Sequence, residues 1–133
     1  MFGAYALRGD DPIFEIIPRG SYQIYRLTQN PVLHSYESRH HEFNRLYKLL
    51  GESPEPMVLF DFEQCLAIDS ILVSILVDLT YRCRDLDGNA VITNISQELM
   101  QMVDSLMQLQ PNHKRAKWTL YPNIPAAEMH LPW

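Results

Sequence analysis

The chain has 133 residues, enough for one domain with a hydrophobic core and too few for two. Its apolar fraction of 47% is normal for a globular protein, and a net charge of −5 with a pI near 5.4 argues against a nucleic-acid partner. Two cysteines, with no secretory signal and no apolar run of transmembrane length, predict reduced thiols in a cytoplasmic protein without direct membrane insertion.

The first part of the chain predicts a β-hairpin after a loose leader at residues 1–12. Residues 13–17 and 22–27 have the composition of two strands. Pro18 and Gly20 lie between them and predict a tight turn, so the two strands are expected to form a hairpin.

Helical and strand patterns then alternate to the end of the chain. Helices are expected at residues 36–50, 70–86 and 96–109, and strands at residues 57–62, 90–95 and 118–121. Four apolar residues of the first helix fall on one face: Phe43, Leu46, Tyr47 and Leu50. Strands that alternate with helices predict a largely parallel sheet. With the hairpin added, we expect an α/β fold with a mixed sheet of four to five strands and helices mainly on one face.

The helix ends and the core also have signals in the sequence. Gly88 is expected to end the second helix as its C′ residue, and Ser96 to cap the third. One short helical turn is expected at Ala126–Met129. The core is expected to contain these apolar residues: Leu59, Ile75, Leu79, Ile92, Val103 and Leu106.

The pair Asp69-Ser70 is the most informative local feature, because it lies between an apolar strand ending at Asp61 and a long apolar helix. The backbone N–H groups at the start of a helix point outward and favour a phosphate group. A serine or aspartate at this position can equally be a simple N-cap that bonds only to its own helix. The residues alone leave both interpretations open.

Four segments in this order resemble the STAS domain, the fold of anti-sigma factor antagonists and of the cytoplasmic ends of sulfate transporters. They are a strand ending in an acid, an Asp-Ser motif, a helix–glycine–strand unit and a serine-led helix start: Val58–Phe62, Ile68–Ser70, Arg82–Ile92 and Ile95–Leu99. The resemblance covers residues 13–129, which we take as the domain, with a tail at 130–133.

This resemblance implies a regulatory function. In such antagonists a partner serine kinase, which is also the anti-sigma factor, phosphorylates the serine that follows the aspartate. The unphosphorylated antagonist binds the kinase and frees the sigma factor, and phosphate disrupts the complex. The resemblance therefore implies that Ser70 is the phosphoacceptor, with Asp61 and Asp69 as the acids beside it. The sequence itself has no Gly-rich phosphate loop and no nucleophile elbow, so we expect no enzymatic activity and no cofactor.

Ile71 and Leu72 depart from the family pattern, in which the serine is followed by another Ser or Thr and then Gly. Small residues let a partner's backbone and nucleotide approach closely, and a leucine adds several heavy atoms there. We expect one of the two side chains to face solvent as an apolar contact patch. The expected partner-binding residues are Asp61, Asp69, Ser70, Ile71 and Leu72.

The same departure favours an alternative function. The chain could keep the fold without phosphorylation, as a scaffold or small subunit of a larger stressosome-like or lipid-transport-like complex. A small-ligand or nucleotide-binding function is a weaker third interpretation. The two main hypotheses differ in whether the complex with the partner responds to ATP.

The remaining polar clusters do not predict a metal site or a catalytic site. His41-Glu42 is not followed by a histidine three residues later, and the neighbouring His40 points about 100° away from His41 on a helix, so we expect no metal site. Asp61 and Asp69 could be paired carboxylates, but no base, nucleophile or metal ligand completes a mechanism with them. No catalytic residue is therefore predicted.

Overall fold

The computed structural model describes residues 12–109 and 115–133, so the predicted leader, apart from Pro12, lies outside the described residues. The elements in chain order are β1 (Phe14–Pro18), β2 (Gln23–Leu27), the short 3₁₀ helix η2 (Pro31–Leu33), α1 (Tyr36–Leu50), β3 (Met57–Asp61), α2 (Ser70–Asp85), β4 (Asn89–Thr93), α3 (Gln97–Gln108), β5 (Leu120–Tyr121) and α4 (Ile124–Glu128). Among the described residues, no helix is long and apolar enough to cross a bilayer. The α/β order predicted from the sequence is confirmed.

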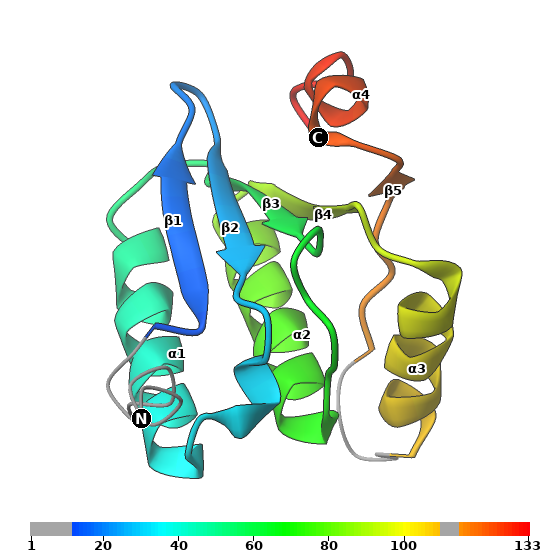
Figure 1. Ribbon diagram of the computed structural model, residues 1–133. Helices are drawn as coiled ribbons and strands as arrows, with labels where there is room; N and C mark the ends of the chain where they lie inside the picture. Colours follow the sequence, from blue (N-terminus) through cyan, green and yellow to red (C-terminus); the bar gives the residue numbers. More distant parts are fainter. Residues whose placement is uncertain (1–11, 110–114) are drawn as a thin grey trace, which may run out of the picture.

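The five strands form one mixed sheet in the order β1-β2-β3-β4-β5 (Figure 1). β1 and β2 pair antiparallel as the predicted hairpin, and each later neighbouring pair is parallel. α1, α2 and α3 pack on one face of the sheet, and α4 packs on the other. The expected arrangement of helices mainly on one face is therefore confirmed.

The strands alternate between the two faces, as their period of two requires. In β3, Val58 and Phe60 join the core under the three long helices, whereas Leu59 joins a smaller cluster with Ala127 of α4. Five of the six predicted core residues are buried, namely Leu59, Ile75, Leu79, Ile92 and Val103, and Leu106 is half-buried.

Leu79 gives a direct test of this packing. Its side chain in α2 is 0% exposed and belongs to the main core cluster. We expect Leu79→Ala to lower the free energy of unfolding by about 2–5 kcal/mol, because it removes buried contacts and leaves a cavity. Urea denaturation measures the loss, with Leu49→Ala as the control, since Leu49 on α1 is 37% exposed. Equal losses in the two variants would contradict this placement.

The turn after α2 differs from the sequence expectation. Asp87, with φ of 65°, and not Gly88, takes the left-handed conformation after the helix. Gly88 is needed for another reason, because a Cβ atom there would collide with the backbone of Pro56. The predicted role of Gly88 as the left-handed C′ residue is therefore wrong.

The C-terminal segment covers part of the second face of the sheet. The Nε1–H of Trp133 donates to the carbonyl oxygen of Ala127 at 2.9 Å, and its ring meets Tyr22 edge-on at 5.1 Å. The Tyr22 hydroxyl donates to Glu128 at 2.8 Å. Burial and this hydrogen bond raise the pKa of Tyr22 to about 12. α4 itself falls where the sequence predicted a helical turn.

Candidate functional site

The N-terminus of α2 is built by Asp69. The Asp69 backbone is extended, and its Oδ1 accepts a hydrogen bond from the N–H of Leu72 at 2.9 Å. Asp69 is therefore the N-cap, and the interpretation of Ser70 as only a helix cap is wrong. Ser70 is the first residue of the helix, and its side chain is half-buried.

Asp69 is also held from α1. The Nη1 of Arg39 lies 2.8 Å from Oδ1 and 2.6 Å from Oδ2 of Asp69. The Arg39 side chain is only 6% exposed, and that of Asp69 is 35% exposed. This ion pair joins the two helices and balances the charge of Asp69 directly beside Ser70. The sequence reasoning did not identify Arg39.

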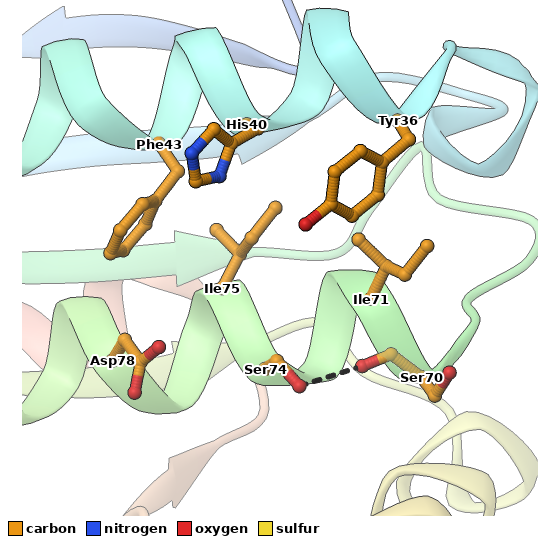
Figure 2. Close-up of a pocket in the computed structure, with 8 residues that line it drawn as sticks. All are labelled: Tyr36, His40, Phe43, Ser70, Ile71, Ser74, Ile75 and Asp78. Atoms are coloured by element: carbon orange, nitrogen blue, oxygen red, sulfur yellow. Dashed lines mark hydrogen bonds between the residues drawn. The ribbon is translucent and has the colours of Figure 1, made fainter.

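A groove of about 360 Å³ runs between α1 and α2 beside Ser70, and eight residues line it: Tyr36, His40, Phe43, Ser70, Ile71, Ser74, Ile75 and Asp78. Figure 2 shows Ile71 and Ile75 projecting from α2 toward the three aromatic side chains of α1. Ser70, Ser74 and Asp78 follow the other edge of α2 (Figure 2). Tyr36 is 61% exposed and stacks on His40 with ring centroids 5.9 Å apart. The groove thus has an apolar floor and a hydroxyl-rich edge.

The two residues after Ser70 have different surroundings. Leu72 is 0% exposed and lies in the main core, whereas Ile71 is half-buried in the groove. Two connections add exposed apolar surface: Leu33 in the connection between β2 and α1, and Leu66 in the connection between β3 and α2. These connections are joined by a hydrogen bond from the N–H of Leu66 to the carbonyl oxygen of Gln29 at 2.9 Å. Apolar surface near Ser70 is therefore supplied by Ile71 and not by Leu72.

Asp61 lies inside the molecule, at 0% exposure. It accepts hydrogen bonds from Arg26 Nε at 2.8 Å, Asn94 Nδ2 at 2.9 Å, Thr93 Oγ1 at 3.4 Å and the N–H of Glu63 at 3.3 Å. The hydrogen bond to Asp61 raises the pKa of Arg26. Asp61 thereby joins β2, β4 and the start of the β3–α2 connection. A direct contact between Asp61 and a partner is ruled out by this burial.

The acids and histidines of α1 point in different directions. Glu42 is buried and accepts from Arg45 Nη2 at 3.0 Å, whereas His40 lines the groove and His41 is exposed. Within residues 12–109 and 115–133, no group of three or more His, Cys, Asp or Glu side chains could hold a metal ion.

The sequence matches no protein-family model and no curated protein. Its structure is similar to that of an RsbS variant from Moorella thermoacetica, with a TM-score of 0.67 and 10% identity over 87% of this chain and 92% of that one. It is also similar to the anti-sigma factor antagonist SpoIIAA in its unphosphorylated form, with a TM-score of 0.64 and 13% identity over 87% and 92% of the two chains.

A third similar structure is an anti-sigma factor antagonist (STAS) domain protein from Planctomyces limnophilus, with a TM-score of 0.64 and 11% identity over 87% of this chain and 95% of that one. At these identities the likeness concerns the fold. The chain has the STAS fold that its sequence predicted.

Proposed function

We propose that this chain is a STAS-type regulatory protein, an anti-sigma factor antagonist that binds a serine kinase acting also as an anti-sigma factor. Phosphorylation of Ser70 ends that binding. The observation that carries the proposal is the position of Ser70, a half-buried residue at the first turn of a 16-residue helix and at the edge of an apolar groove. SpoIIAA, which has the same fold, is named as an anti-sigma factor antagonist in an unphosphorylated form.

The proposed docking face consists of Ser70 and Ile71 from α2 and Tyr36, His40 and Phe43 from α1. These residues line the groove from both sides. Asp69 contributes at its margin, where Arg39 already balances its charge. Asp61 and Leu72 are left out of this face because both are buried.

A phosphate on Ser70 adds a charge of about −1.5 to −2 at the edge of this groove. A partner surface that fits the apolar side chains would then have to cover a charged group and remove its water, which is unfavourable. The start of a helix tolerates a phosphate, because its outward N–H groups can donate to the added oxygens. The expected result is loss of the complex and retention of the fold.

In the transfer itself this chain supplies only the acceptor. The Ser70 hydroxyl oxygen forms the new bond to the γ-phosphorus of ATP held by the kinase, the bond from that phosphorus to the ADP oxygen breaks, and the hydroxyl proton passes to a base of the kinase. No residue of this chain needs to act as a catalyst.

The test incubates the chain with a candidate partner serine kinase and ATP and maps phosphate by mass spectrometry. We expect one phosphate on the unsubstituted chain and on Ser74→Ala, and none on Ser70→Ala. Ser74 is a matched control because it lines the same groove one turn further along α2 and donates to the carbonyl oxygen of Ser70 at 3.0 Å. A phosphate that persists in Ser70→Ala would contradict the proposed acceptor.

One observation favours the alternative of a constitutive interaction module in a scaffold or a larger complex. Ile71 occupies the groove at the point where small residues would let a partner and its nucleotide approach Ser70 closely. A stable complex that ATP does not affect, with Ser70 unmodified, would support this module and reject the phosphorylation switch.

A further inference from the structure

Arg39 has hydrogen-bonding capacity that its ion pair does not use. Its Nη1 alone contacts both oxygens of Asp69, at 2.8 and 2.6 Å, in place of the two-nitrogen fork that guanidinium groups form with carboxylates. Its Nε is buried and has no hydrogen-bond partner among the described residues. A buried donor without an acceptor is unfavourable, so a further anion beside it would be stabilised.

This unused donor belongs to a side chain of α1 that contacts Asp69, the N-cap of α2. Asp69 immediately precedes Ser70, so the guanidinium that holds Asp69 lies against the first turn of the helix. The N–H groups of Ser70 and Ile71 have no partner within α2, because the first four N–H groups of a helix lie beyond its internal hydrogen bonds. A cation and outward N–H donors therefore meet within one residue of the proposed phosphoacceptor.

We propose that Arg39 and the first turn of α2 form the receiving site for the phosphate on Ser70. This inference rests on the proposed function, in which Ser70 becomes phosphorylated. The phosphate accepts hydrogen bonds from Arg39, either from the unused Nε–H or from the Nη1 group that now donates to Asp69. Because Arg39 belongs to α1 and Ser70 to α2, the phosphate then acts on both walls of the groove and not only through its charge.

Other charged groups near the groove must be separated from Arg39. His40 lines the groove from α1 and could also pair with a phosphate, and Asp78 lines it from α2 with a negative charge. Glu37 lies in the first turn of α1, exposed to solvent. Asp69 is the nearest acid and competes directly for Arg39.

The test installs phosphoserine at position 70 during translation, so that no kinase is needed. Failure of a kinase to modify Ser70 is thereby distinguishable from failure of this inference. Phosphorus NMR then follows the second ionisation of the phosphate, whose ordinary pKa is about 6. We expect Arg39→Gln to raise this pKa by about one unit, because a neighbouring cation favours the dianion. His40→Gln is the matched control and should change it much less.

Asp69→Asn makes the test stricter, since asparagine can still cap the helix but no longer competes for Arg39. The effect of Arg39→Gln should be larger in this background than in the native one. If the effect is the same or smaller, Asp69 and the phosphate do not share Arg39, and the proposed exchange is wrong.

A measurement on the unsubstituted chain covers the case in which Arg39→Gln fails to fold. The ¹⁵N and proton signals of the Arg39 Nε–H are compared with and without phosphoserine at position 70. We expect the Nε–H proton to move downfield as it gains a charged acceptor. An unchanged Arg39 signal, or a larger pKa change in His40→Gln than in Arg39→Gln, would overturn the proposal.

Discussion

Replacing Arg26 with methionine is expected to lower the free energy of unfolding by about 3–5 kcal/mol, because it leaves a buried carboxylate without its cation. Asp61 is 0% exposed, and Arg26 Nε donates to it at 2.8 Å. The other donors to Asp61 come from Asn94, Thr93 and a backbone N–H, all of which are neutral. Methionine reproduces the apolar stem of arginine, so the change removes mainly the guanidinium group with its charge and hydrogen bond. Urea denaturation at neutral pH measures the loss.

Two further variants separate the buried pair from the surface charge. Glu15 lies 3.7 Å from Arg26 and its side chain is 60% exposed, so Glu15→Gln should cost about 0.5 kcal/mol or less. The double variant with Arg26→Met and Asp61→Asn should lose less stability than the sum of the two single changes, because it no longer buries an unpaired charge. A loss in Arg26→Met as small as that in Glu15→Gln would show that the pair does not stabilise the fold.

The sequence predicted the elements well because their signals are local. The bounds of α1, Tyr36–Leu50, agree with the expected helix, and Ser96 caps α3 by accepting from the N–H of Leu99 at 3.0 Å. The C′ role of Gly88 was wrong because α2 ends one residue earlier than expected, with Leu86 as the C-cap and Asp87 at C′. The observed role of Gly88, a close approach to the backbone of Pro56, joins segments that are distant in the chain. Such an approach leaves no local pattern in the sequence.

The buried face of α1 shows a second limit. Tyr47 belongs to the apolar face read from the sequence but is 40% exposed, whereas Arg39 and Glu42 are buried together with Leu46 and Leu50. The apolar residues alone indicate a face that is rotated about the helix axis relative to the face that is actually buried. The buried residues follow a helical spacing of three, four and four, which could have indicated two buried charged side chains.

The site was therefore only partly predictable. Asp69 and Ser70 were found because a helix start has a sequence signal, and the side chain of Asp69 does cap α2. The partner of Asp69 could not be found in this way, because Arg39 lies 30 residues earlier in the chain. The groove depends in the same way on the packing of α1 against α2, which no single segment specifies.

Replacing Ile71 with aspartate is expected to weaken the complex with the proposed partner kinase by about thirtyfold, the effect of losing a contact worth about 2 kcal/mol. Ile71 projects across the groove toward the aromatic side chains of α1 (Figure 2), and a carboxylate there would be desolvated by an apolar partner surface. The fold should survive, because the side chain is half-buried and an acid in the first turn of a helix interacts favourably with the helix dipole. Isothermal titration calorimetry measures the affinity, and a thermal melt measures the stability.

Two aspartate variants at other positions make this result specific to the docking face. Met129 is 83% exposed at the end of α4, on the other side of the sheet, so Met129→Asp should leave both affinity and stability unchanged. Leu72 is 0% exposed, so Leu72→Asp should unfold the chain by burying a charge without a partner. If Ile71→Asp binds the kinase as tightly as Met129→Asp does, the partner does not dock in the groove. If Ile71→Asp unfolds the chain as Leu72→Asp does, then Ile71 belongs to the core and offers no surface for recognition.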